Sequence, residues 1–389
     1  MDVSITFSFF LIFTGAAVFA SLALATRQPL IIAYIALGAF IGPHGLSLVS
    51  GTKLLADIGH VGIIFLLFLL GLDMQPQALW STLRKSTVVA VASSALFLAM
   101  GFAVTRLFGY SNVEALIVGA AMMFSSTIIG IKLLPTTVLH HRHIGELMIG
   151  MLLLQDLLAI IVLMVLFSAS TGDGNMGRDL ALSLLGLPLL AGAALLVVRF
   201  VLLPLIARFD RFHEYIFLLA LGWCLGLAEA ARALGLSEEI GAFIAGITIA
   251  TSPISQYIAV NLKPLRDFFL ILFFFAVGAR FDLSMLGQVW LPALVLAVLV
   301  LAVKPPTYRW LLKGVSEKRS LAWDLGFRLG QASEFSLLIA YVAAGAALIS
   351  EEASLLIQAA TLITLLASSY IVVLNYPTPI AISDRLRRD

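Results

Sequence analysis

Charged residues are scarce in this chain, and cysteine is almost absent. Asp, Glu, Lys and Arg make up 12% of its 389 residues, whereas soluble globular proteins contain roughly 25%. The net charge of +2 is too small, and the basic residues too dispersed, to indicate a nucleic-acid-binding surface. The single cysteine, Cys224, excludes an internal disulfide. With 61% hydrophobic residues and a mean hydropathy of +1.06, an all-α polytopic protein of the lipid bilayer is predicted.

The first apolar stretch lacks the features of a cleaved signal peptide. It follows Met1 and Asp2 without a basic segment, and no small-residue cleavage site precedes a polar domain. A retained first helix is therefore expected. Thirteen apolar segments are predicted: about 4–25, 29–42, 57–72, 86–108, 113–134, 144–168, 180–206, 214–234, 238–251, 265–279, 286–312, 322–347 and 353–374. The second, third, ninth and tenth are shorter than the ~20 residues of a straight span.

Basic residues predict the orientation of these segments, because cytoplasmic loops carry an excess of Lys and Arg. One set of alternate loops, including the C-terminus, holds fifteen: Arg27, Arg84, Lys85, Lys132, Arg142, Arg208, Arg211, Lys263, Arg266, Lys313, Lys318, Arg319, Arg385, Arg387 and Arg388. The other set holds five: Lys53, Arg106, Arg178, Arg232 and Arg280. Thirteen spans, with the N-terminus outside and the C-terminus in the cytoplasm, are therefore expected.

A carboxylate in the sixth segment is the strongest candidate for a functional group. Gln155 and Asp156 lie within the apolar run MIGMLLLQDLLAIIVLMV. A central Asp costs roughly 2.5–3.5 kcal/mol on insertion scales, so an embedded acid normally faces a cavity or a partner. The alternative is a neutral, hydrogen-bonded structural Asp. The other embedded polar residues favour a functional site.

Two apolar segments are interrupted by polar residues. In the fifth segment the consecutive hydroxyls of Ser125, Ser126 and Thr127 precede Pro135, although a single membrane hydroxyl is usually structural. The twelfth segment carries polar residues around Gly330, namely Arg328, Gln331, Ser333 and Glu334. Interrupted helices at corresponding positions of two halves indicate a midplane site built on an inverted repeat. They are the fifth and the twelfth segments, seven positions apart, which fits two six-helix halves joined by a linking helix.

Lys304 in the eleventh segment precedes Pro305 and Pro306. Proline frees backbone carbonyls, so a kink beside the ammonium is predicted. The alternative is a lysine that extends to the membrane surface. Two other motifs are set aside: Gly172, Gly174 and Gly177 fit a dinucleotide pattern but follow no strand, and the histidines His140, His141 and His143 lack a further metal ligand of suitable spacing.

Six stretches taken in order resemble the monovalent cation:proton antiporter-2 family, closest to its Kef-type potassium:proton branch. They are PLIIAYIALGAFIGP, GHVGIIFLLFLLGLDM, SSTIIGIKLL, LLLQDLLAII, PLRDFFLILFFFAVGARFDL and RLGQASEFSLLIA. The resemblance implies a thirteen-helix sodium/proton antiporter fold with two broken, crossing helices, and a homodimer in a cell inner membrane. It also implies core-type helices at about 86–168 and 286–374, dimerisation-type helices at about 4–72 and 214–279, and a linking helix at about 180–206.

The resemblance also implies roles for individual residues. Asp156 matches the carboxylate that binds the ion and the proton, and Lys304 matches a core lysine. Gln155 directly precedes that carboxylate. The two helix breaks match Ser125–Thr127 and Gln331–Glu334. Electrogenic sodium:proton members have two adjacent acids where this chain has Gln155 and Asp156, so one carboxylate remains there and Gln155 offers the lysine no counter-ion.

Transport rather than enzymatic catalysis is therefore expected, with no cofactor and no metal beyond the transported K⁺ or Na⁺. A single carboxylate for which cation and proton compete predicts electroneutral K⁺/H⁺ exchange. Alternatives are Na⁺/H⁺ antiport, a gated cation channel, an organic-anion symporter, and a receptor or scaffold without transport. Kef-type relatives often continue into a cytoplasmic nucleotide-binding regulatory domain. This chain contains no such domain, and the sequence does not decide between a short member and the membrane part of a longer protein.

Overall fold

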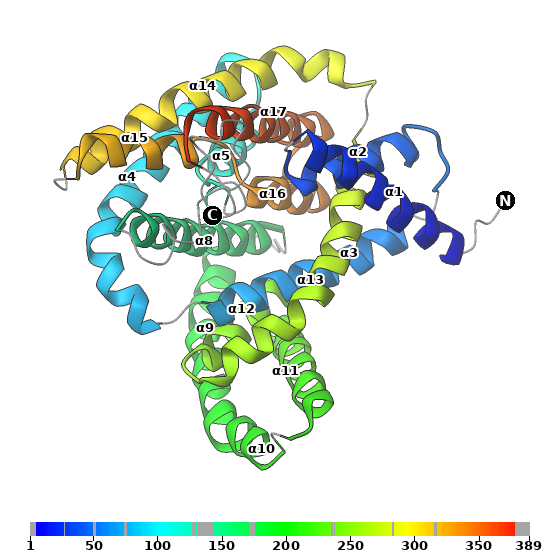
Figure 1. Ribbon diagram of the computed structural model, residues 1–389, viewed down its shortest axis with the longest axis vertical. Coiled ribbons are helices and arrows are strands. Elements are labelled where there is room, and N and C mark those ends of the chain that lie inside the picture. The colour runs from blue at the N-terminus through cyan, green and yellow to red at the C-terminus, as the bar shows by residue number, and fades with distance from the viewer. Residues whose placement is uncertain are drawn as a thin grey trace. The chain divides into compact units, whose positions relative to one another are not determined.

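Every regular element in the described part of the chain is a helix (Figure 1). The computed structural model describes residues 5–26, 28–49, 52–73, 76–126, 130, 143–170, 176–209, 211–234, 236, 238–281, 284–314 and 317–377. The chain divides into two compact units: the first comprises Met1–Ser50, Ser81–Leu163 and Val277–Asp389, and the second comprises Gly51–Trp80 and Met164–Ala276.

The first unit contains the predicted site. Its helices are α1 (Ile5–Ala25), α2 (Leu30–Ile41), most of α4 (Pro76–Leu107), α5 (Asn112–Met122), most of α8 (His143–Ser170), α14 (Leu286–Gly314), α15 (Arg319–Arg328), α16 (Glu334–Gly345) and α17 (Glu351–Asn375). Within it, α17 packs along α14 and α16, and α15 packs along α14. The helices α5 and α16 also pack together, which joins the two interrupted segments.

The second unit contains the other described helices. They are α3 (Thr52–Asp73), α9 (Met176–Val197), the π-helix η1 (Val198–Leu202), α10 (Leu203–Arg208), α11 (His213–Ala233), α12 (Glu238–Ala250) and most of α13 (Ile254–Ala279). The closest packing is between α3 and α12. A Cβ at Gly246 would overlap the carbonyl oxygen of Phe68, so the absence of a side chain permits this approach. Small residues serve the same purpose at many membrane helix interfaces.

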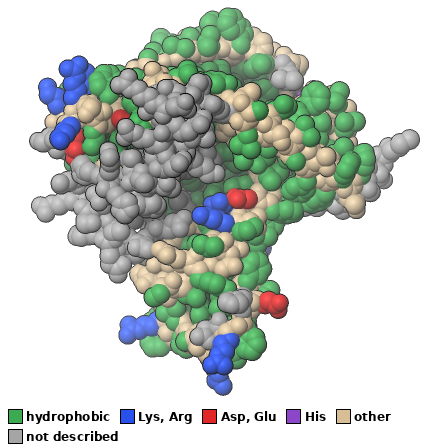
Figure 2. Space-filling model, in the orientation of Figure 1, with side chains coloured by type: hydrophobic (Ala, Val, Ile, Leu, Met, Phe, Trp, Pro, Cys, Tyr) green, Lys and Arg blue, Asp and Glu red, His purple; other side chains and the backbone are tan. Residues whose placement is uncertain are grey.

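Six of the described helices are long and apolar enough to span a membrane, so this is a multi-pass membrane protein. The six stretches are Thr6–Ala25, Thr87–Leu107, Gly186–Arg208, Glu214–Ala233, Leu286–Gly314 and Glu351–Asn375. Figure 2 shows hydrophobic side chains over much of the described surface on one face, as expected where lipid is the solvent. The total of thirteen spans and the inverted repeat stay predictions.

The short predicted segments divide into two kinds. The third and tenth gain residues that the sequence assigned to loops, because α3 begins at Thr52 and α13 at Ile254. By contrast, α2 and α12 stay short, at 12 and 13 residues. The predicted linking helix contains a π-helical turn at Val198–Leu202. Pro204 follows this turn and has no N–H to donate, which disturbs the regular α-helical pattern there.

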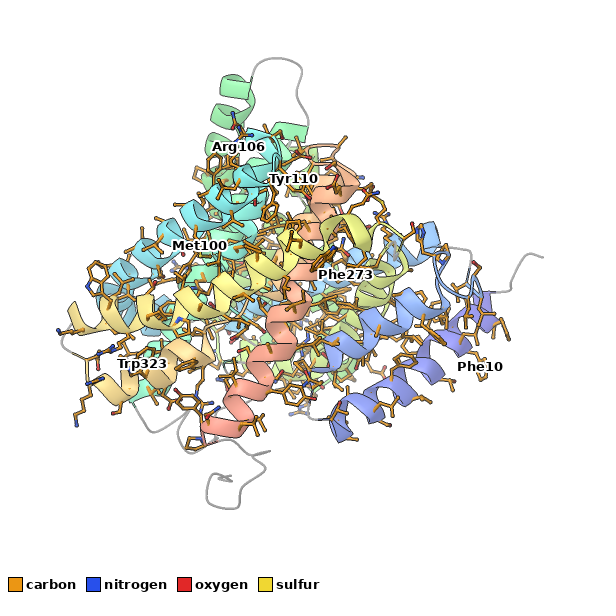
Figure 3. The ribbon with its side chains drawn as sticks, turned by 90° about the horizontal axis from the view of Figure 1, so that it is seen from above. Phe10, Met100, Arg106, Tyr110, Phe273 and Trp323 are labelled. Carbon is orange, nitrogen blue, oxygen red and sulfur yellow. The ribbon has the colours of Figure 1, made fainter. Side chains whose placement is uncertain are left out.

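A polar cluster fixes the turn between α4 and α5 to the start of α17. Arg106 donates to the carbonyl oxygen of Tyr110, and these two residues lie together at one end of α4 (Figure 3). The Tyr110 hydroxyl donates to Glu352 Oε1 at 2.9 Å. Burial, and then the carboxylate of Glu352, raises the pKa of Tyr110, so the hydroxyl stays protonated and donates at neutral pH.

Candidate functional site

The structure places helix breaks in both interrupted segments. The first is at the end of α5, where Met122 is the last helical residue and Phe124, Ser125 and Ser126 are non-helical. The second lies between α15, which ends at Arg328, and α16, which begins at Glu334. The described residues thus show an interruption between α15 and α16, and for the fifth segment they show the end of α5. Thr127, which the sequence assigned to the first break, lies outside them.

Lys304 joins the two breaks. Its side chain is 0% exposed, and its Nζ donates to the carbonyl oxygens of Phe124 at 2.6 Å and Gln331 at 2.9 Å. The ammonium also lies 5.1 Å from the centre of the Phe97 ring, within cation–π range. Lys304 therefore does not extend to the membrane surface. None of the ion pairs among the described residues includes Lys304.

Gln155 links α8 to the first break. Its Oε1 accepts from the backbone N–H of Ser125 at 3.0 Å, and its Nε2 donates to the hydroxyl of Tyr308 at 2.7 Å. The Ser125 hydroxyl donates to the carbonyl oxygen of Leu329 at 2.8 Å, beside the second break. Gln155 thus positions the first break, because its amide oxygen binds the backbone there and its amide nitrogen binds Tyr308 of α14. One lone pair of Oε1 remains for a further donor or a cation.

The sequence analysis did not identify Tyr308, although its hydroxyl contacts both Gln155 and Ser125. It is fully buried on α14, and its hydroxyl also lies 3.3 Å from Ser125 Oγ. Its ring packs edge-on against Phe97, with centroids 5.5 Å apart. One signal was present, because Tyr308 lies four residues after Lys304 and therefore on the same helix face. No sequence signal indicated Phe97, which comes from α4.

Asp156 and Glu334 are both buried carboxylates of the predicted site. Asp156 on α8 is 3% exposed, and Glu334 in the first turn of α16 is 8% exposed. The sequence named both residues as members of the site, Asp156 as the ion-binding carboxylate and Glu334 as part of the second break.

Hydrogen bonds hold the second break to α15, to the first break and to α17. The amide of Gln331 donates to the carbonyl oxygens of Arg328 at 2.9 Å and Ser126 at 3.4 Å, and accepts from Ser368 Oγ at 2.9 Å. Ser333 caps α16, with its Oγ accepting from the N–H of Phe335 at 3.2 Å. Such a cap satisfies a donor that the start of a helix leaves free.

Arg328 supports the second break from α15. It is 1% exposed, and its Nε donates to Asp324 Oδ1 at 2.7 Å. Its Nη2 donates to the carbonyl oxygen of Pro377, just beyond α17, at 2.8 Å. A buried guanidinium is stable only when paired and hydrogen-bonded, and these contacts meet that requirement.

The two motifs that sequence analysis set aside fall largely outside the described residues. Gly172, Gly174, His140 and His141 all do. Among the residues that are described, no group of three or more His, Cys, Asp or Glu side chains could hold a metal ion. The candidate ligands in the described part of the site are carboxylate, amide, hydroxyl and carbonyl oxygens. Oxygen ligands of this kind suit a hard cation.

Tyr308→Phe is expected to weaken the site without unfolding the protein. Loss of the hydroxyl leaves Gln155 Nε2 without this acceptor, so the free energy of unfolding should fall by about 1–3 kcal/mol. Because Gln155 then no longer holds Ser125 as firmly, the cation concentration that gives half-maximal proton movement should rise. Melting in detergent and liposome assays measure the two effects, with the exposed Tyr370→Phe on α17 as control. A lower melting temperature with unchanged cation dependence would restrict Tyr308 to a structural role.

Comparison with known proteins assigns the chain to a family. The pattern of the family described as "Sodium/hydrogen exchanger, transmembrane" matches residues 9–374. The chain belongs to this family. It is 30% identical over 353 residues to the iron transporter MagA of Paramagnetospirillum magneticum, covering 88% of this chain and 79% of MagA.

A second relative is the glutathione-regulated potassium-efflux system protein KefC of Cronobacter sakazakii. It is 30% identical over 359 residues, covering 88% of this chain but 56% of KefC, so the chain spans little more than half of that relative. The sodium proton antiporter MjNhaP1 from Methanocaldococcus jannaschii has a similar fold, with a TM-score of 0.69, 18% identity, and coverage of 92% of this chain and 94% of the other. The Kef-type resemblance is thereby confirmed.

Proposed function

We propose that this member of the exchanger family is a K⁺/H⁺ antiporter in which cation and proton compete for Asp156. The observation that carries the proposal is the buried Asp156, which directly follows Gln155, the residue whose amide binds Ser125 at the first break. Its membership of the sodium/hydrogen exchanger family and the potassium efflux named for KefC support cation:proton exchange.

The physics of a buried carboxylate explains the competition. An ionised carboxylate within the membrane is costly unless a proton neutralises it or a cation binds to it. A bound cation must also recover the hydration that it loses, and carboxylate, amide, hydroxyl and carbonyl oxygens at broken helices supply it. If the site changes its exposure from one side of the membrane to the other only when neutralised, each cycle exchanges a cation for a proton.

Lys304 has a supporting role in this mechanism. Its ammonium binds carbonyl oxygens at the first and second breaks, and the carbonyl ends of helices carry partial negative charge. It therefore stabilises the two interrupted segments and leaves Asp156 for the transported ion.

Stoichiometry depends on Glu334 as well as Asp156. One-to-one, electroneutral exchange requires that Asp156 alone releases and takes up a proton. Glu334 is a second buried carboxylate of the site, in the first turn of α16. If both carboxylates exchanged a proton, each cycle would move two protons per monovalent cation and would respond to voltage.

K⁺ is the proposed cation because Gln155 supplies a neutral amide where electrogenic relatives have a second acid. The amide oxygen already accepts from the N–H of Ser125, so it compensates weakly for lost hydration. Potassium sheds its water more readily than sodium, and a site of low field strength favours it. The alternative function is Na⁺/H⁺ antiport, with Na⁺ bound at the same site.

In liposomes containing a pH-sensitive dye, we expect a K⁺ gradient alone to move protons, faster than an equal Na⁺ gradient. The rate should be the same with and without a clamped membrane potential, because one positive charge leaves as another enters. Liposomes without protein give the background. Faster exchange with Na⁺ would contradict the selectivity, and a rate that follows the imposed voltage would contradict one-to-one exchange.

The same assay separates the other classes of protein. A gated cation channel would pass K⁺ without coupled proton movement, and an organic-anion symporter would require its substrate. A receptor or scaffold would give neither. Because one relative is named an iron transporter, Fe²⁺ belongs among the cations tested.

The cellular setting forms part of the proposal. Transport would take place in a cell inner membrane, with the N-terminus outside and the C-terminus in the cytoplasm. The protein would act as a homodimer, with core-type helices moving against dimerisation-type helices. A cytoplasmic regulatory domain or subunit would act on it in the cell.

A further inference from the structure

A groove in the first unit lies apart from the residues around Asp156. It is lined by Val88 and Val89 of α4 and by Trp310, Leu311, Lys313 and Gly314 of α14, and its volume is about 480 Å³. The proposed transport mechanism uses none of these side chains.

The groove lies at the ends of two spanning helices. Val88 and Val89 follow the basic residues Arg84 and Lys85, where the apolar part of α4 begins, and Trp310 is near the last residue of the span Leu286–Gly314. These ends meet at the groove, so it lies where hydrocarbon gives way to head groups. Trp310 is 70% exposed, and tryptophan is enriched at this depth in membrane proteins.

The lining combines apolar walls with a basic end. Val88 is 66% exposed, which suits a face in contact with acyl chains. Lys313 is exposed at the end of α14, and Lys318 and Arg319 are exposed just beyond it. Figure 2 shows Lys and Arg side chains gathered near the end of α14 and the start of α15. One acidic residue, Glu317, lies between Lys313 and Lys318 in the sequence. The three basic residues at this end of the groove therefore leave a net positive charge.

We propose that this groove binds one anionic phospholipid of the bilayer. An acyl chain would lie against Val88, Val89, Trp310 and Leu311, and the phosphate would interact with Lys313. Basic pockets between membrane helices bind anionic head groups in this way. A soluble polar ligand would instead need further buried polar partners, which the apolar walls do not offer.

Occupation of the groove would stabilise the helices that hold the core lysine. Val89 belongs to a buried cluster with Phe97, Tyr308 and Leu312, and the Phe97 ring lies against Lys304. A lipid between α4 and α14 would therefore raise the stability of the packing around Lys304. This inference rests on the membrane position of the groove and is independent of which cation is exchanged.

The test uses the full chain, purified and stripped of lipid, then incubated with phosphatidylglycerol or phosphatidylcholine in mixed micelles. Bound lipid is counted by native mass spectrometry, and melting is followed in parallel. Phosphatidylglycerol should bind more tightly and raise the melting temperature more. Lys313→Gln should weaken its binding about fivefold, as expected for one basic residue at an anionic surface. Val88→Trp should block the groove, and the exposed Lys263→Gln should change neither readout.

Several results would overturn the proposal. Equal binding of the two lipids would remove the role of charge, and unchanged binding in Lys313→Gln and Val88→Trp would place any bound lipid elsewhere. Stabilisation by inorganic phosphate alone would show a free-anion site. Loss of dimer in Val88→Trp, without a change in lipid binding, would identify the groove as a contact between copies of this chain.

Discussion

Asp156→Asn is expected to reduce cation-driven proton movement to the background of empty liposomes while the protein stays folded and inserted. Asn keeps the shape of the side chain but cannot bind and release the proton. Asp156 is 3% exposed, and a neutral Asn of similar volume avoids the cost of burying a charge. The melting temperature should therefore equal or exceed that of the wild type.

The control is Asp267→Asn, which removes an exposed carboxylate beside Arg266 in the second unit. It should leave transport unchanged, since surface ion pairs contribute little to stability. Glu334→Gln adds a further comparison, because it removes the second carboxylate without touching the first. Wild-type proton movement in Asp156→Asn would refute the mechanism, and retained movement only in the presence of Glu334 would reassign the proton to that residue.

Lys304→Met is expected to cause a large loss of stability. The ammonium donates to the carbonyl oxygens of Phe124 and Gln331 in a fully buried place. Methionine fills a similar volume without a donor and leaves both acceptors without this partner. Unsatisfied buried acceptors cost about 1–3 kcal/mol each, and relief from burying a charge offsets part of this cost. A net loss of roughly 2 kcal/mol in the free energy of unfolding is expected.

Lys304→Gln provides the sharper comparison, because its amide keeps two N–H donors without the charge. It should lose less stability than the Met variant and still alter the pH profile of transport, since a nearby positive charge affects the titration of the site. The exposed Lys263→Met should melt as the wild type does. Equal melting of wild type, Met and Gln variants, with unchanged pH dependence, would exclude a supporting role for Lys304.

Local sequence patterns were sufficient to predict most helix positions. Apolar runs bounded by polar residues placed α1, α2, α8, α11 and α17 within a few residues of their ends, because each span must bury its own backbone polar groups. The segments for α3 and α13 were predicted too short. Their first turns carry polar residues that a hydropathy pattern assigns to loops, although these residues can continue a helix beyond the hydrocarbon region.

The sequence by itself determined that this chain enters the membrane and where polar groups interrupt it. Apolar composition requires lipid as solvent, and Asp156, Lys304 and the polar run near Gly330 are costly enough there to indicate a site. Tertiary structure alone decided how these groups pair. Lys304 binds carbonyl oxygens of residues 180 and 27 positions away, and Gln155 binds Ser125 and Tyr308. Such pairings depend on which helix faces pack together, and hydropathy along a single segment does not record the neighbours of that segment.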